Sequence, residues 1–335
     1  MNNDTIATQK RQLLDIANAA LEHWELDGKL SLIKYRENAV YRLDTVCGQR
    51  FALRVHRRDY HSNVALSSEL TWAQSLRQAG LQVPLAVPTC AGAPFASITY
   101  GPGSPWQVDL LEWVTGAQIG SCEEGLGDDP EAIANAYRTI GEIAARIHNH
   151  SEEWNRPASF QRHSWDLDGL VGEQPMWGRF WELECLTPEQ RALILEARDR
   201  ALSDLRNLGQ GPGDYGLIHA DLVPENVLSD GARVQVIDFD DAGFGWYLFE
   251  LATALYFIQG DTHFALARDA LIEGYRRQRS LGDDKLAWLP LFMAVRSFTY
   301  LGWVHTRQGT ETAKDLTPML VAMCCDTVKR YLKRN

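Results

Sequence analysis

The chain of 335 residues is long enough for one large domain or two moderate ones, and its 45% hydrophobic and 23% charged residues are ordinary for a globular protein. Its formal net charge of -11 argues against a broad nucleic-acid-binding face, which needs basic residues. Residues 1–10 lack an apolar signal core, and no apolar run reaches the roughly 18 residues of a membrane span, so we expect a cytoplasmic protein without nucleic-acid or membrane partners.

The first third of the chain is predicted to be a small sheet with accompanying helices. The spacing of apolar residues predicts helices over residues 5–24 and 63–79, the second ending at Gly80. Alternating apolar and polar residues predict antiparallel strands at 30–35, 39–46, 50–56, 94–99 and 107–114.

From residue 129 onward the pattern is mostly helical. Thr187-Pro188-Glu189-Gln190 has the spacing of a capping box and predicts the start of a helix over 187–208. Two short strands are predicted at 216–219 and 234–239. The other predicted helices cover 130–150, 246–259, 263–278, 285–306 and 318–332. We therefore predict an α+β chain with an antiparallel-sheet part, residues 1–114, and a larger, mainly helical part, residues 115–335.

The segment with the clearest chemistry lies around the two short strands of the second part. His219-x-Asp221-x-x-x-x-Asn226 follows the first strand, and Asp238-Phe239-Asp240 ends the second. Phosphoryl transfer needs a group that accepts the proton of the acceptor hydroxyl and a Mg²⁺ ion that neutralises the phosphates. Asp221 suits the base, and the oxygen atoms of Asn226 and Asp238 suit the metal.

This segment resembles the Brenner motif of the aminoglycoside phosphotransferase and choline kinase superfamily, relatives of the protein kinases. Ala220 stands where that family commonly has Ala or Gly, and Pro224 where it often has Pro. The resemblance implies a two-lobed protein-kinase-like fold with ATP and Mg²⁺ as cofactors. The N-lobe, residues 1–114, would cover the nucleotide phosphates, and the C-lobe, residues 115–335, would carry the catalytic loop.

The N-terminal part contains further features of the same superfamily. Residues 37–41, which include Asn38, resemble its phosphate-covering turn. The strand Phe51-Ala52-Leu53-Arg54-Val55 resembles the Val-Ala-Ile-Lys strand of kinases, and Arg54 stands at the position of its cationic Lys. Glu69 follows 15 residues later on a predicted helix. The resemblance implies that Glu69 holds the Arg54 cation toward the phosphates. Arg54 departs from the usual Lys, being bulkier and able to bind phosphate bidentately.

The connector between the two parts is predicted at Leu110-Leu111-Glu112-Trp113-Val114. By its position, the backbone of Glu112 and Val114 would hydrogen-bond adenine. No Gly-x-x-x-x-Gly-Lys-Ser/Thr is present, which disfavours a P-loop kinase.

Substrate contacts are predicted from two places in the C-terminal part. Asp240 or Asp241 would pair with an ammonium group of the acceptor. Tyr300 and Trp303 share a helix face with Arg296 and offer aromatic rings for a cation, although packing in the core is the simpler interpretation.

The sequence leaves the phosphate acceptor open. A small hydroxyl compound, such as an amino alcohol, is the first choice, because small molecules are the commoner acceptors of the superfamily. The alternatives are a protein Ser/Thr substrate, as in the stress-response kinase A branch, and an inactive ATP-binding regulator, which Arg54 leaves open. A helical binding protein without a nucleotide site is a fourth interpretation.

Overall fold

The computed structural model describes residues 3–35, 38–121 and 125–333. The chain folds into two compact units. Unit 1 takes in the chain up to Ala117 together with Asn155–Arg162 and Leu228–Ile237, and unit 2 takes in the rest. The first segment of unit 1 ends three residues after the predicted boundary at 114, and the two later segments join it from within the second part of the sequence.

Unit 1 is built on an antiparallel sheet with the strand order β1-β2-β3-β5-β4. Its strands are β1 (Gly28–Tyr35), β2 (Ala39–Thr45), β3 (Arg50–Val55), β4 (Ala96–Ile98) and β5 (Trp106–Glu112). Successive side chains of a strand point to opposite faces, so each strand contributes to two surfaces. Arg54 of β3 lies directly opposite Asp109 of β5 in the register, and the two residues therefore share one face.

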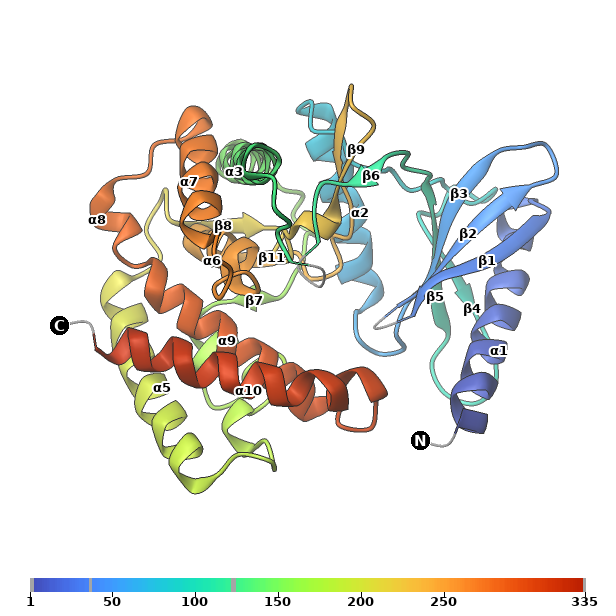
Figure 1. Ribbon diagram of the computed structural model, residues 1–335. Helices are drawn as coiled ribbons and strands as arrows, with labels where there is room; N and C mark the ends of the chain where they lie inside the picture. The colour runs from blue at the N-terminus through green and yellow to red at the C-terminus, as the bar shows by residue number, and fades with distance from the viewer. Residues whose placement is uncertain (1–2, 36–37, 122–124, 334–335) are drawn as a thin grey trace. The chain divides into compact units, whose positions relative to one another are not determined.

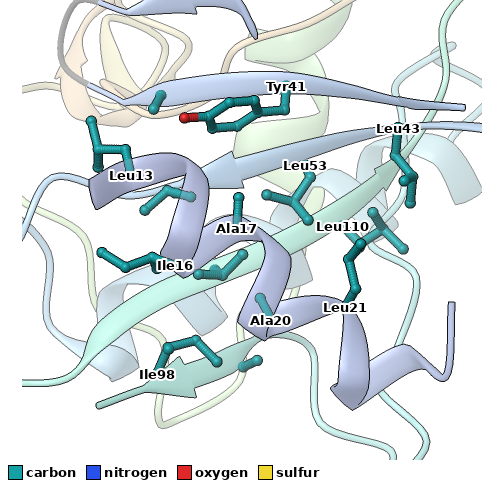
Figure 2. Close-up of a cluster of buried hydrophobic side chains, with 14 of the residues drawn as sticks. Leu13, Ile16, Ala17, Ala20, Leu21, Tyr41, Leu43, Leu53, Ile98 and Leu110 are labelled. Atoms are coloured by element: carbon teal, nitrogen blue, oxygen red, sulfur yellow. The ribbon is translucent and has the colours of Figure 1, made fainter. Parts of the chain in front are cut away.

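The two faces of this sheet are covered by different helices (Figure 1). On one face, α1 (Asn3–Ala20) and the 3-10 helix η1 (Leu21–Trp24) pack apolar side chains against the strands, as Figure 2 shows for Ile16 and Ala17 beside Leu53 and Leu110. On the other face, α2 (Asn63–Gln78) packs Leu66 and Leu70 against Leu111. The alternation of the strands thus directs Arg54 and Asp109 toward α2.

Unit 2 is mainly helical. Its long helices are α3 (Pro130–Glu153), α5 (Pro188–Leu208), α6 (Tyr247–Tyr256), α7 (Phe264–Gln278), α9 (Leu289–Thr306) and α10 (Glu311–Leu332), and its short ones are α4 (Leu167–Val171), η2 (Phe180–Glu182) and α8 (Asp283–Leu286). Helix α9 contacts α5, α6 and α10 and is buried along most of its length. A residue on α9 can therefore lie deep inside unit 2.

Helices α3 and α7 touch through their backbones at two glycines. A Cβ atom added to Gly141 would lie 2.0 Å from the backbone O of Leu271, and one added to Gly274 would lie 2.0 Å from the backbone O of Arg138. Only a residue without a Cβ atom fits at such a distance, so these glycines set the close approach of the two helices.

Short strands carry the candidate site. The strands β7 (Ser164–Trp165), β11 (Gly243–Trp246) and β8 (Tyr215–Ile218) form a sheet in this order. The 3-10 turn η3 (Pro224–Asn226) ends the loop after β8. The remaining short strands are β6 (Ala117–Gln118), β9 (Val227–Ser229) and β10 (Val234–Val236).

The predicted elements are present, with differences at some ends, and the helix predicted over 285–306 is divided into α8 and α9. The capping box at Thr187 is confirmed, since Thr187 and Gln190 bond each other's backbone N–H groups. The last helix begins at Glu311 instead of Pro318, because Thr310 caps it, and Pro318 lies inside. The strand predicted over 234–239 ends at Val236. Among the described helices, none combines the length and apolar character needed to cross a membrane.

Candidate active site

The loop after β8 holds Asp221 in a defined orientation. The side-chain nitrogen of Asn226 donates hydrogen bonds of 2.8 Å to the backbone O and to Oδ2 of Asp221. The Asp221 side chain remains 30% exposed, so a ligand can reach it. Because the amide nitrogen of Asn226 is engaged with Asp221, the amide oxygen is the atom that suits a hard cation.

Two residues of the site adopt a left-handed backbone that is unusual outside glycine. Ala220 has a φ of 64° and Asp238 a φ of 68°. Such a conformation costs a non-glycine residue about 1 kcal/mol or more and persists only where the surroundings impose it. At Asp238 it interrupts the extended chain after β10, which explains why that strand is shorter than predicted.

The two motif segments meet through an aromatic contact. The rings of His219 and Phe239 pack with their centroids 4.5 Å apart, and His219 is fully buried. His219 Nδ1 also accepts a hydrogen bond of 3.3 Å from the backbone N–H of Asp221. Asp238 is exposed, whereas Asp240 is buried. The exposed Asp238 carboxylate and the Asn226 amide are oxygen donors of the kind that Mg²⁺ prefers, so the residues present fit such an ion.

Glu250 of α6 binds the backbone of the loop after β8 from its buried side. Its carboxylate is completely buried and accepts hydrogen bonds from the backbone N–H of His219 at 2.6 Å and of Ala220 at 3.1 Å. Burial alone would raise the pKa of Glu250, but its interactions with His148 and His219 outweigh burial and lower the pKa. An ionised Glu250 therefore holds the strained Ala220 in place.

Arg296 of α9 approaches Asp221 from the core. Its Nη2 atom lies 3.5 Å from Asp221 Oδ1 and donates a 2.8 Å hydrogen bond to the hydroxyl of Tyr300. Arg296 also lies over the Tyr300 ring, 4.4 Å from its centroid. Tyr300 is thus brought to the site through Arg296, whereas the ring of Trp303 lies against Arg307, at 5.0 Å.

Asp241 completes the cluster of carboxylates. Its backbone O accepts hydrogen bonds from Trp165 Nε1 of β7 at 2.9 Å and from His163 Nε2, just before β7, at 3.0 Å. Loss of hydration raises the pKa of Asp241 well above its ordinary value, and the charges of Asp221, Asp240 and Asp238 act in the same direction, while Arg296 opposes them. A cation placed beside Asp241 would favour the ionised form of this carboxyl group and so oppose the rise of its pKa.

Unit 1 contains a separate buried cluster of charges around Arg54. The Arg54 guanidinium donates to Glu69 at 2.9 Å and to both oxygens of Asp109, at 2.9 and 2.6 Å. His56 Nε2 lies 3.0 Å from the same carboxylate, and Arg162 lies 3.5 Å from Glu69. Burial would raise the pKa of Asp109, but the charges of Arg54 and His56 hold it well below its usual range.

The other residues predicted to bind the nucleotide lie in unit 1. The Asn38 side chain accepts a 3.0 Å hydrogen bond from the backbone N–H of Arg57. Glu37, from the same predicted turn, lies outside the described residues. The Glu112 side chain pairs with Arg77 at the end of β5, and Val114 follows on the same segment. Their predicted contacts with ATP remain predictions.

The sequence prediction gave no role at these clusters to Asp109 or Arg296, and it left open whether Glu250 braces the loop. Asp109 is an acid between apolar residues in the interior of β5, and it lies two residues from Leu111, so both residues point to the α2 face. Glu250-Leu251-Ala252 stands where the superfamily often has Asp-Leu-Ala, and that likeness is a usable signal for Glu250. Arg296 gives no such signal, because an Arg in a helix is usually exposed.

Comparisons with known proteins show the family to which the chain is related and the kinases that it resembles. The family model described as "Phosphotransferase enzyme family" matches residues 32–289. A solved structure of a microcompartment-associated aminopropanol kinase has a TM-score of 0.85 and 33% identity, covering 95% of this chain and 97% of that one. Amicoumacin kinase of Bacillus subtilis (strain 168) is 22% identical over 301 residues, 87% of this chain and 84% of that protein. The amicoumacin kinase hAmiN, solved with AMP-PNP, Ca²⁺ and Ami, has a TM-score of 0.72 and 20% identity, covering 98% and 94%.

Proposed function

Because this chain belongs to the phosphotransferase enzyme family, we propose that it moves the γ-phosphoryl group of ATP to the hydroxyl group of a small amino alcohol. The observation that carries the substrate class is the 33% identity to an aminopropanol kinase over nearly the whole of both chains. The acidic groups of Asp240 and Asp241 near Asp221 support it, because a primary ammonium group would offset the repulsion among their charges.

In this proposal Asp221 is the base of the reaction. Its carboxylate accepts the proton of the acceptor hydroxyl while the oxygen attacks the γ-phosphorus and the bond to the β-γ bridging oxygen breaks, which yields the phosphate ester and ADP. Asn226 orients the carboxylate through its 2.8 Å hydrogen bond to Oδ2. Asn226 and Asp238 would hold the divalent cation, which neutralises charge on the phosphates.

The remaining predicted roles follow from the same proposal. Arg54, fixed by Glu69 and Asp109, would contact the phosphates of ATP. Asp240 or Asp241 would bind the ammonium group of the acceptor. The rings of Tyr300 and Trp303 stay predicted substrate contacts, although Tyr300 already engages Arg296.

A screen for the acceptor tests this proposal. ATP consumption would be followed with aminopropanol, ethanolamine, other hydroxyl metabolites and a casein-like protein. We expect an amino alcohol to be turned over with the highest kcat/KM. Turnover of casein with no small acceptor would support the protein-kinase alternative instead, and ATP binding without any turnover would support the inactive regulator.

The role of Asp221 is tested by Asp221→Asn. This variant keeps the shape of the side chain but removes the group that accepts the proton, so kcat should fall by about 10²–10⁴-fold while ATP binding measured by calorimetry stays close to wild type. Asp199→Asn, on the exposed side of α5, is the matched control and should keep normal turnover. A normal kcat in Asp221→Asn would show that the base is assigned to the wrong residue.

A further inference from the structure

The guanidinium of Arg296 is enclosed by aromatic rings. The side chain is fully buried, and its central carbon lies 4.4 Å from the centroid of Tyr300, 5.3 Å from that of Phe249 and 5.4 Å from that of Trp177. These rings come from α9, from α6 and from the loop after α4. The faces of aromatic rings attract a cation although the rings carry no net charge, so these rings stabilise the charged form of Arg296 inside the protein.

The hydrogen bonds of Arg296 are few for a buried arginine. Its Nε and Nη1 atoms have no hydrogen-bond acceptor within the described part of the chain, and Nη2 reaches Tyr300 and Asp221. A buried charge is costly unless a partner compensates it. Among the described ion pairs, Arg296 is paired with Asp221, so its positive charge acts on the proposed base.

Another buried arginine of unit 2 shows the contrast. Arg198 of α5 also lies over an aromatic ring, 4.2 Å from the centroid of Trp181. It donates to the backbone O of Val171 and of Gly172, and it pairs with Glu173. The hydrogen bonds of Arg198 thus stabilise the end of α4, whereas Arg296 has no such structural contact with a backbone carbonyl among the described hydrogen bonds.

The enclosure depends on a close contact between α9 and the loop that carries Trp177. A Cβ atom added to Gly302 would lie 2.8 Å from the backbone O of Gly178 and 3.1 Å from that of Trp177. Thr306 donates a 3.2 Å hydrogen bond to the same Trp177 oxygen. Because Gly302 has no side chain, the loop can approach α9 closely enough to place the Trp177 ring beside Arg296.

We propose that Arg296 is a positioning residue for Asp221, an inference that rests on the proposed function. Asn226 binds Oδ2 of the carboxylate and Arg296 lies against Oδ1, so the two residues fix the plane of the base from its two sides. The positive charge of Arg296 also acts on the neighbouring Asp241, where it opposes the repulsion from the charges of Asp221, Asp240 and Asp238.

The test compares Arg296→Met and Arg296→Lys with the control Arg198→Met. For each variant, kcat, the KM for ATP and the KM for the amino alcohol are measured together with the melting temperature. Arg296→Met should lower kcat by about 10–100-fold, because the base loses its orientation, while the KM for ATP changes less than about 3-fold. Arg296→Lys keeps the charge and should recover part of the kcat. Arg198→Met should lower the melting temperature with little loss of kcat.

A second variant covers the case in which Arg296→Met does not fold. Tyr300→Phe keeps the ring but removes the hydroxyl that orients Nη2, and it should lower kcat by about 3–10-fold at an almost unchanged melting temperature. A wild-type kcat in folded Arg296→Met, or in both Arg296→Lys and Tyr300→Phe, overturns the inference. Equal kcat losses in Arg296→Met and Arg198→Met would also overturn it.

If the proposed function is wrong, the experiment gives a result that differs from failure of the Arg296 inference. In that case the wild type itself phosphorylates no amino alcohol. The same variants are then compared on the acceptor that the screen identifies or, without one, on slow hydrolysis of ATP, where the base orients water. A folded Arg296→Met variant that matches the wild type there overturns the role of Arg296 by itself.

Discussion

At the scale of single residues, the two clusters use buried charge in different ways. In unit 1 the Arg54 charge is balanced by two carboxylates, Glu69 and Asp109, in direct contact. In unit 2 the Arg296 charge is enclosed by aromatic rings and lies 3.5 Å from one carboxylate, Asp221. The first arrangement holds the Arg54 cation between two carboxylates, and the second directs the Arg296 cation toward Asp221, the proposed base.

Because Asp109 is a buried partner of Arg54, we expect it to contribute strongly to the stability of the folded protein. Asp109→Asn keeps the size of the side chain but leaves the buried Arg54 charge with one fewer partner. We expect the free energy of unfolding of the variant, measured with denaturant, to fall by about 3–5 kcal/mol. Asp44→Asn is the control, because Asp44 pairs with Arg42 and Arg50 at the exposed end of the same sheet, and its effect should be small. Equal effects of the two variants would contradict this interpretation of the cluster.

At the scale of elements, most helices and strands were predictable from periodicity and caps, and the misses have local causes. The last helix is predicted to begin at Pro318, but it begins seven residues earlier, at Glu311, because Thr310 caps it. The strand after residue 234 was predicted too long, because the positive φ of Asp238 leaves no trace in the apolar pattern. Both errors concern ends, where one side chain or one dihedral decides.

The contact of α3 with α7 gives a prediction at this scale. Gly274→Ala places a methyl group 2.0 Å from the backbone O of Arg138, so the helices must separate. We expect a loss of about 1–3 kcal/mol or more in the free energy of unfolding. Gly260→Ala is the control, since no atom lies within 4 Å of the Cβ position there, and it should be nearly neutral. A neutral Gly274→Ala would mean that α3 can shift without loss.

At the scale of the whole molecule, the predicted α+β, protein-kinase-like fold and the predicted enzyme class are confirmed by the family match and by the likeness to solved kinases. The predicted small-molecule acceptor is supported at the level of its class by the kinases to which the chain is similar. The roles of the individual site residues remain predictions, and each can be tested by substitution.

Nucleotide binding provides a test of the whole chain. If Mg-ATP binds the folded protein, the melting temperature should rise with nucleotide concentration, because a ligand that binds only the native state stabilises it by RT ln(1 + [L]/Kd). Asp238→Asn should reduce the dependence of this shift on Mg²⁺, whereas Asp230→Asn, on an exposed turn, should leave it unchanged. The helical binding protein without a nucleotide site predicts no shift at all.

The sequence by itself determined the order of the elements, the motif that carries Asp221, Asn226 and Asp238, and the family. These features depend on residues close together in the chain, where spacing and backbone preference act directly. Only the tertiary structure decided that Asp109 pairs with Arg54 and that Glu250 and Arg296 contact the loop of His219, Ala220 and Asp221. Periodicity indicates which face of a strand or helix is buried, but the partner on that face depends on how elements from distant parts of the chain pack.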